Sequence, residues 1–354
     1  MNIYTNKKGD FIMLKGYMYG VNLGHWISQY GQKGEDHFCN YIQESDFKRI
    51  SDWGFDHVRL PVDYMLFESD ENPGVYKEEG LKYVDFAVEM CQKYNINVVL
   101  DLHHTPGFTF TNKFDKEKNN LFESNAQQER FINIWRMFTN RYKHIGDSII
   151  FELLNELVLE DSEPWNKLWP KAVQAIKEIS PERRIIVGSN MWNSIEHLKH
   201  LEIVDDKSII YNFHCYAPFL FTHQRANWDK NMLDYQTSVT YPLNVEEHKS
   251  FFIKNDTYLL DNYKVVGKDQ LREFLQPAVD FMKKSEHDLY CGEFGVIANA
   301  DMDSTLRWLE DIISIFNEHG IGHALWSYRG FSKMTYEDNS ENTPYVKAAT
   351  KKTV

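Results

Sequence analysis

Short apolar runs recur along the chain, and an amphipathic segment follows most of them. Each run is brief and rich in β-branched and aromatic residues, which is typical of strands buried in a sheet. Eight runs fit this description, at residues 18–24, 57–62, 97–104, 148–156, 183–190, 208–216, 289–296 and 323–328. Apolar residues three and four positions apart predict helices at 78–95, 127–143 and 163–180.

The run SIIFELLNE at 148–156 fits a helix as well as a strand, because its apolar residues also recur at helical spacing. The flanking segments decide between the two. A helix over 127–143 precedes it, and Pro164 marks the first turn of the next helix. A third helix would leave no strand between these two, so we predict a strand that carries Glu156 at its carboxyl end.

Strands that alternate with helices predict a parallel sheet with helices on both faces. Eight such repeats in 354 residues indicate one α/β domain over residues 1–354, a closed (β/α)8 TIM barrel. The connection at 217–288 is roughly twice as long as a barrel crossover needs. Its polar and aromatic part, 224–268, is expected to form an inserted, partly helical subdomain between the sixth and seventh strands.

Composition and charge narrow the partners. The net charge of −13 would repel nucleic acid and anionic membranes, so we predict neither as a partner. Aromatic residues make up 15% of the chain, and their faces stack on sugar rings, which favours a carbohydrate ligand. No run approaches the ~20 apolar residues of a membrane helix. The N-terminal segment lacks the apolar core of a signal peptide, so we expect a cytoplasmic protein, or a secreted one whose signal was removed.

Polar residues follow most of the predicted strands. In a barrel of this kind, the active site forms at the carboxyl ends of the strands. Those ends supply Asn22, Trp26, Arg59, His103, His104, Asn155, Glu156, His214, Tyr216, Glu293 and Trp326. Any one of them alone would be an ordinary start of a loop. Two glutamates that face each other across one pocket, however, are the minimal machinery for glycoside hydrolysis.

These blocks resemble glycoside hydrolase family 5, the cellulase family. FELLNELV is similar to the Asn-Glu signature of that family, and CGEFGV to its nucleophile strand. The remaining strand-end blocks extend the likeness over nearly the whole chain: GVNLGHWISQY, FDHVRLPVDY, VVLDLHHTPGF, YNFHCYAPFLFTHQ and ALWSYRG. Within the family, the chain resembles the clostridial endoglucanase C type, which also has an insertion between strands six and seven.

The resemblance implies a retaining endo-β-glycanase that needs no cofactor or metal and acts as a monomer. Its substrate would be a β-1,4-linked or mixed-linkage glucan, as a polysaccharide or an oligosaccharide. Glu156 would be the general acid/base and Glu293 the nucleophile, with carboxyl groups ~5–5.5 Å apart. Arg59 would pair with the nucleophile and keep it ionised.

The resemblance also implies supporting residues. Asn155 would bind the 2-hydroxyl of the sugar. His103, His214 and Tyr216 would complete the polar set, with Tyr216 donating to Glu293 and His214 near Glu156.

Five residues are expected to bind substrate: Trp326, His104, Asn22, Trp26 and His25. Trp326 would form the floor under the cleaved sugar. The alternatives are that His104 braces its loop and that Trp26 belongs to the core. His25 stands where the nearest relatives are expected to have glycine, so it would narrow or add a subsite. We also expect the insertion to wall one side of the cleft and to supply contacts from FTHQRANW at 221–228.

Three alternatives stay open. A β-mannanase or glucomannanase of the same family would use the same pair of glutamates. A metal-dependent barrel hydrolase would use His103, His104 and His214, but such sites usually take a His-x-His pair from the first strand, which lacks one here. A glycan-binding barrel without activity would be expected to have lost a glutamate of the pair or Arg59, and all three are present.

Overall fold

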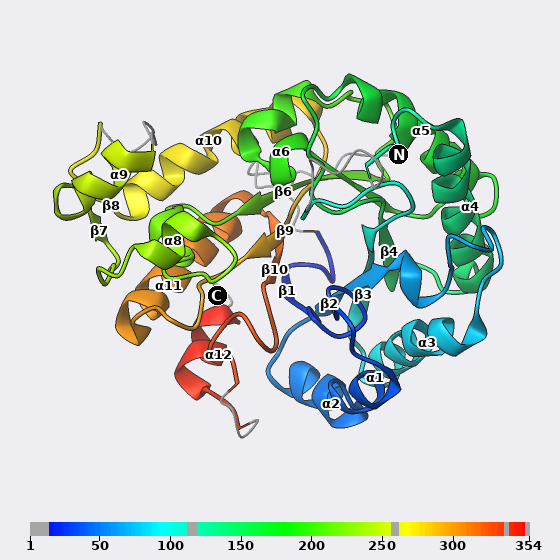
Figure 1. Ribbon diagram of the computed structural model, residues 1–354, viewed down its shortest axis with the longest axis horizontal. Coiled ribbons are helices and arrows are strands. Elements are labelled where there is room, and N and C mark those ends of the chain that lie inside the picture. Colours follow the sequence, from blue (N-terminus) through cyan, green and yellow to red (C-terminus); the bar gives the residue numbers. More distant parts are fainter. Residues whose placement is uncertain (1–13, 112–118, 256–261, 336–339, 351–354) are drawn as a thin grey trace, which may run out of the picture.

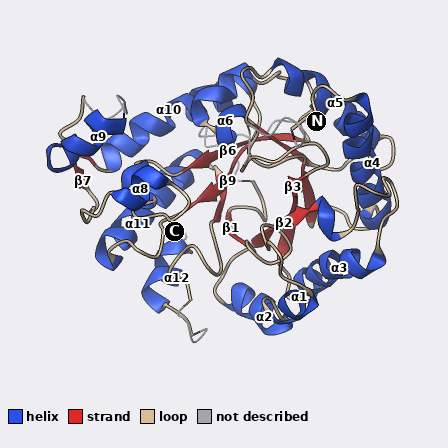
Figure 2. Cartoon of the chain, viewed as in Figure 1, coloured by secondary structure: helices blue, strands red, loops and turns tan. Residues whose placement is uncertain are grey.

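The computed structural model shows a closed barrel of eight parallel strands, as predicted (Figures 1 and 2). It describes residues 14–111, 119–255, 262–335 and 340–350. The barrel strands are β1 (Tyr19–Asn22), β2 (His57–Asp63), β3 (Asn97–His104), β4 (Ile149–Glu152), β5 (Ile185–Gly188), β6 (Ile209–Cys215), β9 (Leu289–Phe294) and β10 (Gly322–Leu325). The ring closes at β1, where Val21 lies opposite Leu325 of β10 and Val58 of β2.

Helices surround the barrel, and the longer ones bury apolar faces against it (Figure 2). They are α1 (Glu35–Asn40), α2 (Glu44–Asp52), α3 (Glu78–Lys93), α4 (Asn125–Tyr142), α5 (Glu163–Lys177), α6 (Asn190–Asn193), α10 (Lys268–Ser285), α11 (Met302–His319) and α12 (Thr343–Ala349), with 3-10 turns η1 (Tyr64–Leu66) and η2 (Ile195–His200). The three helices predicted from the sequence are α3, α4 and α5. Within the described ranges, no helix combines the length and the apolarity needed to cross a membrane.

The predicted strand at 148–156 is shorter than expected. β4 ends at Glu152, although the buried apolar run continues through Leu154. Beyond the strand, the backbone N–H of Leu153 still bonds to Ile186 O at 3.1 Å, and that of Asn155 bonds to Leu102 O at 3.2 Å. Glu156 then adopts a left-handed φ of 36°. The segment therefore leaves the sheet in a buried turn that presents Glu156 at the mouth of the barrel.

The long connection between β6 and β9 forms small elements beside the barrel (Figure 1, left). These are α7 (Phe219–Thr222), α8 (Lys230–Asp234), β7 (Leu243–Asn244), η3 (Glu246–His248), α9 (Lys249–Asn255) and β8 (Val265–Val266). β7 and β8 pair as an antiparallel ribbon, and α10 then returns the chain to β9. The hydroxyl of Tyr241 donates to Asp311 Oδ2 at 2.8 Å, which fastens this connection to α11.

Candidate active site

Two glutamates lie close together at the carboxyl ends of β4 and β9. A carboxyl oxygen of Glu156, one of Glu293 and a ring nitrogen of His214 all lie within 4.8 Å of one another. The Glu156 side chain is 14% exposed and that of Glu293 is 7% exposed, so both are largely buried but still reach solvent. Retaining glycosidases hold their two carboxyl groups about 5–5.5 Å apart, whereas inverting enzymes hold them about 6.5–9.5 Å apart. The spacing seen here suits a retaining reaction.

Glu293 has two partners that favour its ionised form. Nη1 of Arg59 lies 2.9 Å from Glu293 Oε1, and the hydroxyl of Tyr216 donates to Oε2 at 2.9 Å. Both contacts were expected from the sequence. Burial raises the pKa of Glu293 to about 7, and Arg59 and Tyr216 oppose this rise.

Glu156 has surroundings that favour its protonated form. Burial, and next the negative charge of Glu293, raise its pKa well above the usual range for a glutamate. His214 lies beside it as expected, with Nδ1 2.9 Å from Glu156 Oε1. Burial lowers the pKa of His214 well below its ordinary value, so the ring is neutral. Since Nδ2 of Asn193 donates to Nε2 at 3.1 Å, the ring proton lies on Nδ1 and is directed at Glu156, a contact that opposes the effect of burial on this carboxyl group.

Arg59 is the centre of a buried ionic cluster that the sequence analysis missed. Its guanidinium binds Glu152 through Nε at 2.7 Å and Nη2 at 2.8 Å, and Nη2 lies 3.0 Å from Asp101 Oδ2. Glu152 and Asp101 are fully buried, and burial raises the pKa of each to about 7. An acidic residue within an otherwise apolar strand, as in VVLDLHH and SIIFELL, was the available signal, because a buried charge needs a partner.

Several buried polar atoms of this centre have no hydrogen-bond partner among the described residues. They include Nδ2 of Asn155 and Nε2 of His103. Oδ1 of Asn155 accepts from Arg59 at 2.8 Å, and Nδ1 of His103 lies 2.7 Å from Asp101 Oδ2. Unpaired buried polar groups are uncommon. Both atoms therefore have hydrogen-bonding capacity that the described part of the protein does not use.

Trp326 follows β10 and lies parallel to His103, with ring centroids 5.8 Å apart and an angle of 5° between the planes. It is 6% exposed, so only a small part of the indole is open to a ligand. His104 takes the bracing position considered as its alternative. Its Nδ1 lies 2.6 Å from Asp63 Oδ1, and its ring stacks on Phe110 at 4.9 Å.

Two residues expected to bind substrate lie fully inside the protein, which corrects that expectation. Trp26 has no exposed surface, and its Nε1 donates to Phe38 O at 2.8 Å, so it is a core residue. Asn22 is also fully buried and donates to Gly292 O at 3.0 Å. Its Oδ1 accepts from Arg59 at 3.0 Å, so Asn22 orients the arginine rather than a sugar.

The metal-site alternative is not supported by this geometry. His103 and His104 each direct Nδ1 to a carboxylate, and their rings meet nearly at right angles instead of sharing a ligand position with His214. Among the described residues, Glu156, His214 and Glu293 are the one group of three possible metal ligands. The short distance between His214 and Glu156 in this group is explained by the hydrogen bond between them.

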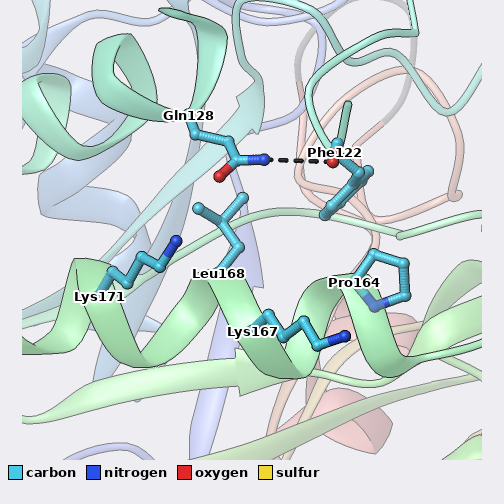
Figure 3. A pocket seen from close by; sticks show the side chains of 6 residues that line it. All are labelled: Phe122, Gln128, Pro164, Lys167, Leu168 and Lys171. Carbon is cyan, nitrogen blue, oxygen red and sulfur yellow. Dashed lines mark hydrogen bonds between the residues drawn. The ribbon is translucent and has the colours of Figure 1, made fainter. Parts of the chain in front are cut away.

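A separate pocket between α4 and α5 lies outside this centre (Figure 3). It is lined by Phe122, Gln128, Pro164, Lys167, Leu168 and Lys171. The amide Nε2 of Gln128 donates to Phe122 O at 3.2 Å across it. These lining residues include no carboxylate, so the pocket lacks the chemistry found at the barrel mouth.

Comparison with known proteins agrees with this site. Residues 19–332 match the family model described as cellulase (glycosyl hydrolase family 5). The chain is 47% identical to Endoglucanase C of Acetivibrio thermocellus over 327 residues, which covers 91% of this chain and 93% of that protein. It is 36% identical to Cellodextrinase A of Ruminococcus flavefaciens, covering 87% of this chain and 84% of that protein.

A solved structure of a hyperthermophilic endo-β-1,4-glucanase in complex with substrate has a TM-score of 0.77 and 26% identity to this chain. The match covers 96% of this chain and 98% of that one. The fold, the family match over most of the chain and the high identity to a curated relative agree with one another. The chain therefore belongs to glycoside hydrolase family 5, the cellulase family.

Proposed function

We propose that this chain is a retaining endo-β-glycanase that hydrolyses β-1,4-linked or mixed-linkage glucans. The observation that carries the proposal is the pair Glu156 and Glu293, with carboxyl oxygens within 4.8 Å and surroundings that separate their protonation states. The similarity to proteins named Endoglucanase C and Cellodextrinase A supports a glucan substrate.

In the first step, the carboxylate of Glu293 attacks the anomeric carbon while Glu156 donates its proton to the glycosidic oxygen. The bond between the anomeric carbon and that oxygen breaks, the shortened glucan leaves as an alcohol, and an ester links the sugar to Glu293. The raised pKa of Glu156 suits it to this role, because it favours the protonated form that the general acid needs. The unpaired Nδ2 of Asn155 and Nε2 of His103 would hold sugar hydroxyls during the attack.

In the second step, Glu156 is a carboxylate and takes a proton from water. The resulting hydroxide equivalent attacks the anomeric carbon, the ester bond breaks, and Glu293 leaves as a carboxylate. Arg59 and Tyr216 stabilise that carboxylate as it re-forms. Two inversions at the anomeric carbon restore the original β configuration.

We infer that the inserted segment adds a wall to this cleft, within one catalytic domain. Trp228 in this segment is 63% exposed and Phe219, which precedes the segment, is 44% exposed, which is unusual for large apolar side chains. The ring of His223 connects both to the centre, because its centroid lies 4.1 Å from that of Phe219, 6.1 Å from that of Trp228 and 4.7 Å from that of Tyr216. Exposed aromatic faces this close to the reacting carboxylates suit the apolar faces of sugar rings.

A panel of polysaccharides tests the proposal. Barley β-glucan or carboxymethyl cellulose should lose viscosity much faster than reducing ends accumulate, because cleavage is internal. The Glu293→Ala variant, assayed alongside, should leave the viscosity unchanged. Hydrolysis of mannan with neither glucan cut would replace the glucanase assignment by a mannanase one. Binding of glucan without any reducing-sugar release would point to a protein that only binds glycans.

A further inference from the structure

His25, in the loop after β1, has a backbone conformation that favours glycine. Its φ is 63°, in the left-handed region. A non-glycine residue persists there only when the surrounding structure determines the conformation, and such positions concentrate at functional sites.

The surrounding structure holds this turn without using the His25 side chain. Nε2 of His37, in α1, lies 2.9 Å from the carbonyl oxygen of His25 and 3.1 Å from that of Trp26. The side chain of Trp26, the residue after His25, also ties this turn to α1, because its Nε1 donates to Phe38 O. All these contacts would be available to a glycine at position 25, so the imidazole is not needed to form the turn.

The imidazole of His25 lies against the residue proposed to carry the reacting sugar. Its ring centroid is 5.7 Å from that of Trp326, with an angle of 73° between the planes. Its Cδ2 is so close to Gly330 that a Cβ on that glycine would lie 3.1 Å away. The ring is therefore wedged between two parts of the loop that follows β10.

The imidazole of His25 is free to bind a ligand. The side chain is only partly buried, and neither ring nitrogen bonds to any residue in the described ranges. Burial, and next the charges of Lys33 and His37, lower the pKa of His25 below its ordinary value. The neutral ring thus presents one donor and one acceptor, which suits a sugar hydroxyl.

The order of the strands around the barrel indicates which part of the glucan would lie near His25. Glu156 follows β4 and would protonate the leaving sugar, so the departing part of the glucan lies on the β4 side. In the ring of strands, β10 is four steps from β4 in either direction, which places it opposite. His25 and Trp326, at the ends of β1 and β10, therefore lie on the side of the sugars that stay with the enzyme.

We propose that His25 is a specificity-determining residue that hydrogen-bonds the sugar next to the one seated on Trp326, on its non-reducing side. This inference rests on the proposed function, because Trp326 is taken as the floor under the cleaved sugar. The contact selects substrates that keep at least two sugars on this side of the cleavage point.

The test compares an aryl β-glucoside, with one sugar, and an aryl β-cellobioside, with two. His25→Gly should raise KM for the cellobioside about 3–10-fold, the effect expected for one lost hydrogen bond, and change kcat/KM for the glucoside less than about twofold. Its Tm should equal the wild-type value or exceed it by about 1–3 °C, because glycine suits the left-handed backbone. His25→Gln, which keeps a donor and an acceptor, should restore much of the lost affinity.

Glu286→Gly is the matched control, since Glu286 caps α10 with a left-handed φ of 56° in a part of the chain unrelated to the site. Its Tm should shift as in His25→Gly while both KM values stay unchanged. An unchanged cellobioside KM in His25→Gly would overturn the inference. An equal loss on both substrates would place the contact on the Trp326 sugar and also overturn it. A Tm several degrees lower would show that the imidazole is structural. Failure of the wild-type enzyme on both substrates would instead refute the proposed function.

Discussion

The hydroxyl of Tyr216 lies 2.9 Å from Oε2 of Glu293 and donates a hydrogen bond to it. This bond, together with Arg59, opposes the effect of burial, which raises the pKa of Glu293 to about 7. Burial also raises the pKa of Glu156, and there the charge of Glu293 adds to the rise. The two carboxyl groups should therefore titrate in a set order, with Glu293 losing its proton first.

This order predicts the pH dependence of activity. The reaction needs Glu293 ionised and Glu156 protonated, so kcat/KM should rise as pH increases toward about 7 and fall at higher pH when Glu156 deprotonates. Tyr216→Phe removes a donor to the ionised form of Glu293, so the rising limb should move to higher pH. A profile measured on an aryl β-cellobioside checks this. An unmoved limb would mean that the tyrosine does not tune the nucleophile.

Replacing Glu156 and replacing Glu293 should cause different kinetic defects. In Glu156→Ala the nucleophile remains, so an aryl glycoside with a good leaving group still forms the glycosyl-enzyme, but no base activates water. Added azide should then restore turnover and yield a β-configured glycosyl azide. The loss should be largest on natural glucans, about 10²–10⁴-fold, because their leaving group needs the acid.

In Glu293→Ala no ester can form, so azide can yield only the inverted α-azide. Labelling with a 2-deoxy-2-fluoro glycoside, followed by peptide mapping, checks the assignment directly. We expect the label on Glu293. A label on Glu156, or an inverted product from the wild-type enzyme, would exchange or abolish the assigned roles.

The buried cluster predicts how stability depends on pH. The pKa of Glu152 is raised from its ordinary value of 4.5 to about 7 in the folded protein. Its favourable contribution is therefore complete below about pH 4.5 and is lost as pH rises through about 7, so the Tm of the wild type should fall between pH 5 and 8. Glu152→Gln should flatten this slope. The exposed Glu182→Gln is the control and should leave the slope unchanged.

The inserted segment predicts a contribution to binding rather than to chemistry. Trp228→Ala should raise KM for β-glucan about 3–10-fold, with a smaller change in kcat, because an exposed ring that stacks on a sugar adds affinity away from the reacting bond. Leu233→Ala, on the neighbouring helix and 44% exposed, is the control and should behave like the wild type. Equal KM and kcat values for the wild type, Trp228→Ala and Leu233→Ala would mean that the insertion does not contribute to substrate binding through Trp228.

The sequence by itself was sufficient to predict the barrel and the meeting of its two glutamates, Glu156 and Glu293. Strand and helix periods are local properties, and eight repeats of the same unit leave one closed arrangement of parallel strands. Because that arrangement gathers the carboxyl ends of all strands at one rim, Glu156 and Glu293 could be expected to meet although they are 137 positions apart in the sequence. The contacts of Arg59 and Tyr216 with Glu293 were expected from the resemblance to the family, and the structure shows both.

Only the tertiary structure decided which polar groups share a partner and which aromatic rings reach the surface. Glu152 and Asp101 surround Arg59 because the register of neighbouring strands brings them to the same level inside the barrel. Trp26 is buried because its ring packs against Phe47 of α2 and Phe86 of α3, and the turn that contains it places His25 in a left-handed backbone conformation. These outcomes depend on contacts between segments far apart in the chain, which no local pattern of apolar and polar residues records.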